Sequence, residues 1–196
     1  RHISPIAREF ARDSTTNLNW PCVPPRNPHG SVLDLSNRPI MCGAAQLNHV
    51  VFGGSDHALY AIDLDQPKKR PLRMCSQRHG HVDWVTSVAY SGDGNIVSGG
   101  MDGRLCFWSR DKRHCTSSCH HTRSISDVTC VGDLAFSGSY DCTVGLWNVQ
   151  VAMSKKGEVK AQSVLRGHKS PVIVVKGSRN TAVSYTHLRA HETVDY

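Results

Sequence analysis

Three sets of side chains in this 196-residue chain have residue types that could carry out chemistry. The stretch "HLRAHE" places His187 and His191 four residues apart, and on a helix that spacing puts both imidazoles on one face, as in zinc sites. The stretch "HCTSSCHH" at 114–121 holds two cysteines and three histidines, and zinc prefers thiolate and imidazole ligands. Two further segments each contain a Ser, a His and an Asp, the residue types of a hydrolase triad. Each set has to be weighed against the elements that would hold it in place.

The Ser, His and Asp residues recur at a fixed spacing. Asp102 and Asp141 are 39 residues apart, as are Trp108 and Trp147, so each Trp follows its Asp by six residues. Apolar residues alternate with polar ones around them, and Gly and Asp mark the joins, which predicts short antiparallel strands connected by tight turns. A weaker copy spans 38–64, with Asp56 at the turn but Phe52 and Ile62 at the Ser and Trp positions, and a fourth copy starts at 166.

A period near 40 residues, with Gly-His early and Trp late, resembles the WD-repeat family of β-propellers. The resemblance covers about 38–182. It implies an all-β fold, a partial β-propeller of four-stranded antiparallel blades, with about three blades plus the start of another, open at both ends. We place the blades at about 38–75, 80–118, 119–166 and 167–182. Residues 1–37 are Pro-rich and are interpreted as a linker or a degenerate blade.

The C-terminal stretch has a different explanation. Residues 183–193, "VSYTHLRAHET", match one reading frame of a common transposase-based sequencing adapter. We therefore interpret 183–196 as an adapter-derived artefact and expect the natural sequence to stop at Ala182, before the turn Asp of the fourth copy. The histidine pair in "HLRAHE" is then no zinc site.

The repeated Ser, His, Asp and Trp residues are expected to be structural. A catalytic site occurs once, whereas this set recurs with the repeat, and no G-x-S-x-G motif accompanies it. The family resemblance implies that the Trp indole donates to Ser, Ser to His and His to Asp within each blade. We expect no catalytic residue. The first copy has no such chain and is expected to rely on apolar packing. The predicted network comprises His81, Ser98, Asp102, Trp108, His121, Ser137, Asp141, Trp147 and His168.

Metal and cofactor binding find little support in the sequence. In "HCTSSCHH", His121 belongs to the predicted network and Cys115 falls where the outer strand should be, so we expect no metal site. No phosphate-cradling glycine motif is present, so neither a cofactor nor a small-molecule substrate is expected. The eight cysteines are spread through apolar runs, which indicates an intracellular protein with reduced thiols. No apolar run of membrane-spanning length occurs.

We therefore expect a non-enzymatic protein–protein interaction scaffold, cytoplasmic or nuclear. By analogy with the family, its partners bind the face that carries the Gly-His loops and the turns at the repeat Asp. The candidates on that face are His57, Asp83, Trp84, Met101, Arg123 and Tyr140. Packing on the inner strand is the alternative role for Trp84. The net charge of +7 and the Lys-rich insertions suggest a second hypothesis, an RNA- or ribonucleoprotein-associated scaffold. A regulatory part of a larger enzyme complex is the third.

Overall fold

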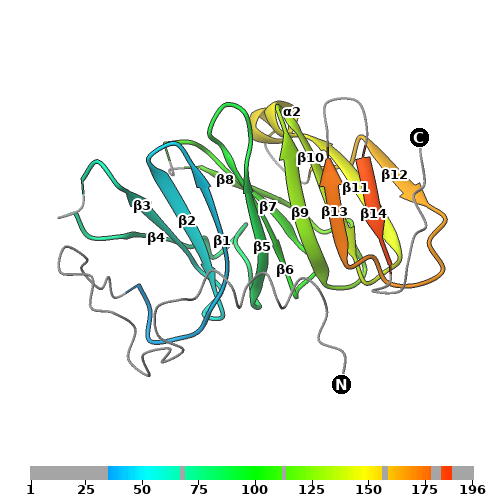
Figure 1. The fold of residues 1–196 in the computed structure, drawn as a ribbon, viewed down its shortest axis with the longest axis horizontal. Coiled ribbons are helices and arrows are strands. Elements are labelled where there is room, and N and C mark those ends of the chain that lie inside the picture. The colour runs from blue at the N-terminus through cyan, green and yellow to red at the C-terminus, as the bar shows by residue number, and fades with distance from the viewer. Residues whose placement is uncertain (1–34, 67–68, 112–113, 156–158, 178–181, 187–196) are drawn as a thin grey trace, which may run out of the picture. The chain divides into compact units, whose positions relative to one another are not determined.

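Four antiparallel sheets follow one another along the chain in the computed structural model, which describes residues 35–66, 69–111, 114–155, 159–177 and 182–186 (Figure 1). Strands are consecutive within each sheet. The first sheet contains β1 (Ile40–Gln46), β2 (His49–Gly54), β3 (Leu59–Asp63) and β4 (Leu72–Met74). The second contains β5 (Val85–Tyr90), β6 (Ile96–Gly100), β7 (Leu105–Trp108) and β8 (Cys115–Ser118). The third contains β9 (Ile125–Val131), β10 (Leu134–Ser139), β11 (Thr143–Asn148) and β12 (Ser163–Arg166), and the last pairs β13 (Val174–Gly177) with β14 (Ala182–Tyr185).

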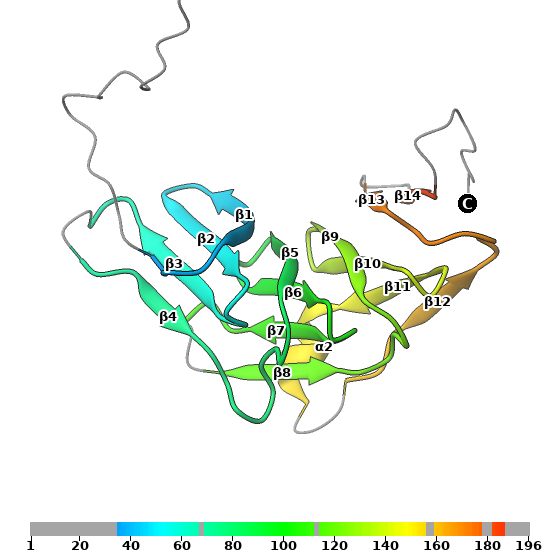
Figure 2. The same cartoon turned by 90° about the horizontal axis from the view of Figure 1, so that it is seen from below.

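The sheets pack face to face, with their first strands β1, β5, β9 and β13 side by side (Figures 1 and 2). One apolar cluster lies between the second and third sheets and includes Phe107, Ile125 and Trp147. Another lies between the first and second sheets and includes Val51 and Trp108. Within the described residues the sheets do not close into a ring. The predicted fold class is therefore confirmed: three four-stranded blades and the start of a fourth.

A repeated side-chain hydrogen bond joins each first strand to the next sheet. A small side chain near the start of the strand donates to the backbone carbonyl that opens the following sheet. The pairs are Cys42 to Val85 (3.6 Å), Thr86 to Ile125 (2.6 Å) and Ser126 to Val172 (2.6 Å). All three acceptors occupy the same repeat position, and Thr86 and Ser126 are also equivalent donors, whereas Cys42 lies one residue further along its strand and makes the longer bond.

The turn between the second and third strands has one shape in all three complete sheets. The residue after the turn aspartate has positive φ in each: 66° at His57, 71° at Gly103 and 67° at Cys142. Glycine is required at the second of these, because a Cβ on Gly103 would lie 3.0 Å from two carbonyl oxygens of the following loop. The next sheet thus approaches this turn closely.

One segment differs from the expectation drawn from the sequence, and the two ends of the chain are not described by the structure. The sequence of the Lys-rich insertion at 149–162 is typical of a long surface loop or an extended connection to the outer strand. The structure has helix α2 (Val149–Ser154) there, which begins where the Asn148 side chain accepts a hydrogen bond from Val151 N. Its Val149 and Ala152 side chains are buried in the second-to-third sheet core. Residues 1–34 and 187–196 lie outside the described part. Val183–Tyr185, part of the predicted adapter segment, belong to β14, and the adapter origin of 183–196 stays a prediction.

Candidate interaction face

A buried chain of four side chains crosses the second sheet. Trp108 Nε1 donates to Ser98 Oγ at 2.9 Å, and Ser98 Oγ lies 2.8 Å from His81 Nε2. His81 Nδ1 lies 3.2 Å from Asp102 Oδ1. Because the Asp102 carboxylate can only accept, Nδ1 carries the histidine proton and Nε2 accepts from the Ser98 hydroxyl.

The third sheet repeats this arrangement. Trp147 Nε1 donates to Ser137 Oγ at 2.8 Å, Ser137 Oγ lies 2.7 Å from His121 Nε2, and His121 Nδ1 lies 3.0 Å from Asp141 Oδ2. Thr143 adds a hydroxyl that donates to Asp141 Oδ1 at 2.6 Å. The sequence did not reveal this fifth member, because the second sheet has Arg104 at the matching position. In the fourth sheet the predicted His168 lies 2.6 Å from Ser184 Oγ.

The charges of these groups follow from burial and hydrogen bonding. Burial opposes ionisation of Asp102, but hydrogen bonds from His81 and from the backbone N–H groups of Val82 and Arg104 outweigh it and lower the pKa of the carboxyl. Burial lowers the pKa of His121, and the opposing effect of Asp141 is smaller. The aspartates are therefore ionised and His121 is neutral at neutral pH.

The arrangement is unsuited to nucleophilic catalysis. The Ser98 and Ser137 side chains belong to residues with no exposed surface, and each hydroxyl is engaged by both an indole N–H and an imidazole. A substrate carbonyl has no route to either oxygen. The chemical role left to the network is to fix the loops that it joins.

The aspartate makes that connection. The second carboxylate oxygen of Asp102 accepts from Val82 N at 2.9 Å, in the loop that leads into β5. In the third sheet Asp141 accepts from Thr122 N at 3.1 Å, in the equivalent loop. Each aspartate thus holds the loop before the first strand against the turn between the second and third strands.

Those loops and turns form one face, called here the loop face, which carries the residues predicted to bind partners. Three of them expose large apolar side chains: Trp84 (45%), Met101 (43%) and Tyr140 (44%). His57 and Arg123 are also exposed, whereas Asp83 is half-buried and its carboxylate accepts from Trp84 N. Trp84 is therefore exposed over much of its side chain rather than buried. Sequence reasoning missed Val82, which is 60% exposed beside the network histidine.

Hydrogen bonds connect the loop face from one sheet to the next. Met101 N donates to Trp84 O at 2.8 Å, Ser124 Oγ donates to Met101 O at 3.0 Å, and Tyr140 N donates to Ser124 O at 3.0 Å. The exposed apolar residues therefore stand on loops whose relative positions are fixed.

The first sheet holds its turn aspartate in another way, which corrects the expectation of apolar packing alone. The Tyr60 hydroxyl donates to Asp56 Oδ2 at 2.5 Å, and the Arg73 guanidinium lies 3.4 Å from the same oxygen. A Cβ added to Gly54 would meet Asp56 and the Tyr60 ring, whereas one added to Gly100 would meet Asp102 and the His81 ring. The Tyr60 ring thus takes the place of the missing histidine.

The Cys- and His-rich stretch at 114–121 does not gather a set of metal ligands. In the described ranges, no group of three or more His, Cys, Asp or Glu side chains could hold a metal ion. Cys115 lies in β8, and His120 and Cys119 are exposed beside it. Burial raises the pKa of Cys42 to about 11 and that of Cys130 to about 12, so both thiols are protonated at neutral pH. Among the residues that the structure describes, no helix is long and apolar enough to cross a membrane.

Comparison with known proteins adds independent information. The family model of the WD domain, G-beta repeat (WD40) matches residues 72–109 and 113–148. Each match begins at or just before the outer strand of one sheet and ends at or just after the last residue of the third strand of the next. The ribosome biogenesis protein YTM1 of Vanderwaltozyma polyspora is 27% identical over 112 residues, covering 52% of this chain and 25% of the relative. The ribosome biogenesis protein WDR12 homolog of Dictyostelium discoideum is 32% identical over 94 residues, covering 45% and 20%. The chain thus spans a quarter or less of these curated relatives.

Solved structures agree on the fold. The structure of U3-55K superposes with a TM-score of 0.66 at 19% identity, over 77% of this chain and 46% of that one. The computationally designed protein Ika4 superposes with a TM-score of 0.64 at 22% identity, over 79% of this chain and 89% of that one. At such identities the likeness concerns the fold alone. Residues 72–109 and 113–148 therefore carry WD40 repeats, and the sheets of the chain have the fold of β-propeller blades.

Proposed function

We propose that this chain is a non-enzymatic scaffold that binds a partner protein through the loop face. The supporting observation is the exposure of Trp84, Met101 and Tyr140 on loops tied together by backbone hydrogen bonds. Aromatic residues and methionine are enriched where proteins meet, and aromatic anchors supply much of the binding energy. Loops that are already fixed lose less conformational entropy on binding, which favours affinity.

Substitution of single exposed aromatic residues on the loop face tests this proposal. Partners would be recovered with tagged protein carrying Trp84→Ala or Tyr140→Ala, and with the control Leu134→Ala, whose side chain is 37% exposed at the opposite end of the sheets. We expect each loop-face variant to lose a common set of partners that the control retains, with a loss of affinity of about 2 kcal/mol for an anchor. Equal recovery by all three variants would refute the assignment.

A second candidate is a scaffold within ribosome assembly. Two relatives carry ribosome biogenesis in their names, and the net charge of +7 favours association with ribonucleoprotein. In that case the protein acts in the nucleus, and co-sedimentation with ribosomal precursor particles would support the candidate. Co-sedimentation that persists after ribonuclease treatment and is abolished by Trp84→Ala would assign the attachment to a protein on the loop face. Absence from those particles would exclude this candidate.

A further inference from the structure

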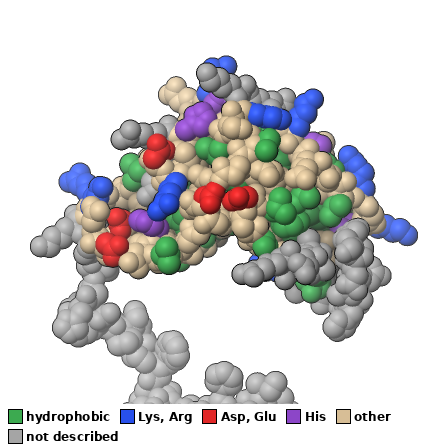
Figure 3. Space-filling view, turned by 90° about the horizontal axis from the view of Figure 1, so that it is seen from above, with side chains coloured by type: hydrophobic (Ala, Val, Ile, Leu, Met, Phe, Trp, Pro, Cys, Tyr) green, Lys and Arg blue, Asp and Glu red, His purple; other side chains and the backbone are tan. Residues whose placement is uncertain are grey.

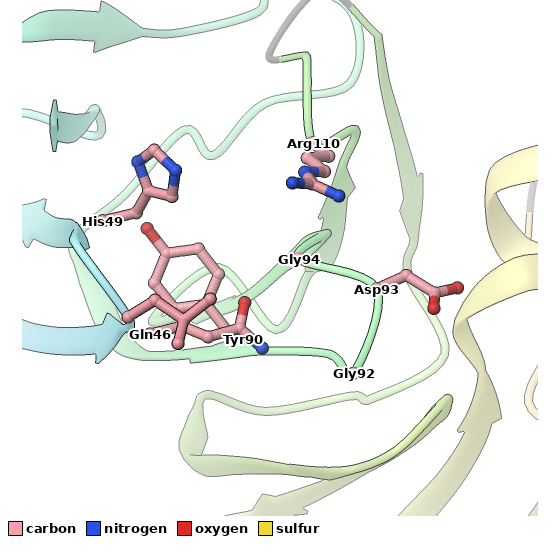
Figure 4. A pocket seen from close by; sticks show the side chains of 8 residues that line it. Gln46, His49, Tyr90, Gly92, Asp93, Gly94 and Arg110 are labelled. Atoms are coloured by element: carbon pink, nitrogen blue, oxygen red, sulfur yellow. The ribbon is translucent and has the colours of Figure 1, made fainter.

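A cavity of about 180 Å³ opens between the first and second sheets, at the end of the strands opposite the loop face (Figure 4). It is lined by the β1–β2 turn, the end of β5, the turn that follows it and the segment after β7. Figure 3 looks onto this end of the sheets, where Lys and Arg side chains lie mostly along the outer rim and acidic side chains nearer the middle. The cavity is too small for a typical drug-sized ligand, whose sites measure about 300–1,000 Å³, and suits a single side chain.

Two buried polar atoms of residues that line this cavity have no hydrogen-bond partner: the Tyr90 hydroxyl oxygen and His49 Nδ1. Asp63 Oδ1 lies 3.9 Å from His49 Nδ1, beyond hydrogen-bond distance. Burial raises the pKa of Tyr90 to about 12, so its hydroxyl remains a donor at neutral pH. A buried polar atom without a partner costs about 1–3 kcal/mol and is rare in native proteins, which indicates that another group completes this site.

The surroundings favour a negatively charged group. Arg110 lines this cavity and also an adjoining one of about 600 Å³, which Lys69 and Arg70 line as well. In the part of the chain that the structure describes, none of these three cations forms an ion pair. The carboxylates that line the two cavities have hydrogen-bond partners of their own: Asp93 accepts from Gln150, Asp63 from Gln66 and Asp111 from Ser109.

The lining also discriminates between two classes of polyanion. Single-stranded RNA is held by stacking of its bases on aromatic side chains, and Tyr90 is the one aromatic residue that lines either cavity, with its hydroxyl buried. The carboxylates of Asp63 and Asp93 would repel a continuous phosphodiester chain. A polypeptide can instead present isolated carboxylates at the positions of the cations.

We propose that the two cavities form a docking site for an acidic segment of a partner protein. One carboxylate of that segment accepts from the Tyr90 hydroxyl and the Arg110 guanidinium in the smaller cavity. A second carboxylate lies beside Lys69 and Arg70 in the larger one. The site is separate from the loop face, so a partner can be held at both ends of the sheets.

Binding of fluorescein-labelled hexaglutamate to the full chain, followed by fluorescence anisotropy at low ionic strength, tests this proposal. Tyr90→Phe and Arg110→Gln should each weaken binding about tenfold, because each removes a hydrogen bond to a charged group. The control Arg166→Gln, an exposed residue of β12 that lines neither cavity, should bind like the unmodified chain. Tyr90→Phe should also melt no lower than the unmodified chain, because the hydroxyl it removes has no partner in the free protein.

Four outcomes would overturn the proposal. The first is failure of hexaglutamate to bind, and the second is equal binding of hexaglutamine. The third is unchanged affinity in Tyr90→Phe. The fourth is tighter binding of oligouridine than of hexaglutamate with the same dependence on Arg110, which would assign the cavities to RNA.

Discussion

The first sheet and the second sheet hold the same turn with different side chains. In the second sheet Asp102 is 4% exposed and is bound by a histidine that comes from the loop before β5. In the first sheet Asp56 is 19% exposed and is bound by Tyr60, from the strand after the turn, and by the largely exposed Arg73. The aspartate and the left-handed residue after it are common to both sheets, and the partners of the aspartate differ.

The difference shows what the histidine contributes. Because His81 comes from the preceding loop, its network ties that loop to the turn and so builds the loop face. The tyrosine comes from β3 and holds the turn only against its own sheet. Before β1, the backbone bond from Ser55 N to Pro39 O, 2.9 Å long, makes the corresponding connection. We therefore expect the second and third sheets to depend on their networks more strongly than the first depends on its substitute.

The largest difference in the free energy of unfolding should come from substitution of the network tryptophan, compared with the residue at the matching position of the first sheet. Trp147→Ala removes a fully buried ring and its hydrogen bond, so we expect a loss of about 4 kcal/mol in the free energy of unfolding. Ile62→Ala, at the matching position of the first sheet, should cost about 2 kcal/mol. Urea denaturation followed by circular dichroism measures both. Equal losses would mean that the network adds nothing to the packing.

Removal of the turn aspartate should cause the next largest difference in stability between the two sheets. Asp102→Ala leaves the buried His81 imidazole and the backbone N–H groups of Val82 and Arg104 without their acceptor, at a cost of about 3 kcal/mol. Asp56→Ala should cost about 2 kcal/mol, because it leaves the hydroxyl of the buried Tyr60 without its acceptor, whereas the Arg73 guanidinium that it also leaves is largely in water. The same denaturation experiment compares them, and the exposed Asp65→Ala serves as the control. A first-sheet variant as unstable as the second-sheet variant would contradict the comparison.

The tyrosine substitute can be tested by itself. Tyr60→Phe keeps the ring that replaces histidine and removes the hydroxyl that donates to Asp56, so we expect a loss of about 1.5 kcal/mol. Tyr140→Phe, on the exposed loop face, should leave stability unchanged. If Tyr60→Phe is also neutral, the ring contributes by packing alone and the polar substitution proposed for the first sheet is wrong.

The smallest effect is a change in pH dependence. The pKa of His121 is lowered by folding, so between its unfolded value, about 6.5, and its folded value the unfolded chain binds the extra proton. Stability should therefore fall as pH drops below about 6.5, and His121→Gln should lose this part of the slope. Folding also lowers the pKa of Asp141, so both proteins should lose further stability as pH falls below about 4. Identical slopes from pH 7 to pH 5 would show that His121 does not contribute.

The sequence predicted the structural features that recur in each repeat, and it missed the features that occur in one sheet only. The 39-residue spacing of the Asp and Trp residues predicted the succession of sheets, because each turn and strand must recur in register. Tyr60 escaped notice because it lies at the position of Cys106, outside the residues that define the motif. Helix α2 is six residues long and too short to show a helical period, although Asn148 is a suitable N-cap.

The cavity between the first and second sheets has no motif at all. His49 and Tyr90 are brought together by the packing of two sheets, and neither residue occupies a repeated position of the sequence motif. Side chains that meet only through such packing follow from the three-dimensional arrangement. By contrast, the family resemblance placed the loop of Trp84 on the loop face, but it left open whether the side chain packs on the inner strand or is exposed, which depends on the packing around that loop.

The offset between the sequence repeat and the sheet has a consequence for chimeric proteins. A unit matched at 72–109 supplies β4 to the first sheet and β5, β6 and β7 to the second. Exchange of that unit with a relative would therefore turn two adjacent blades into hybrids and leave only the blade of β9 to β12 unmixed among the three complete ones. The transplanted β4 would have to pair with the native β3, and the transplanted β7 with the native β8. A crossover placed between β4 and β5, and another between β8 and β9, would instead transfer an intact blade together with its own network.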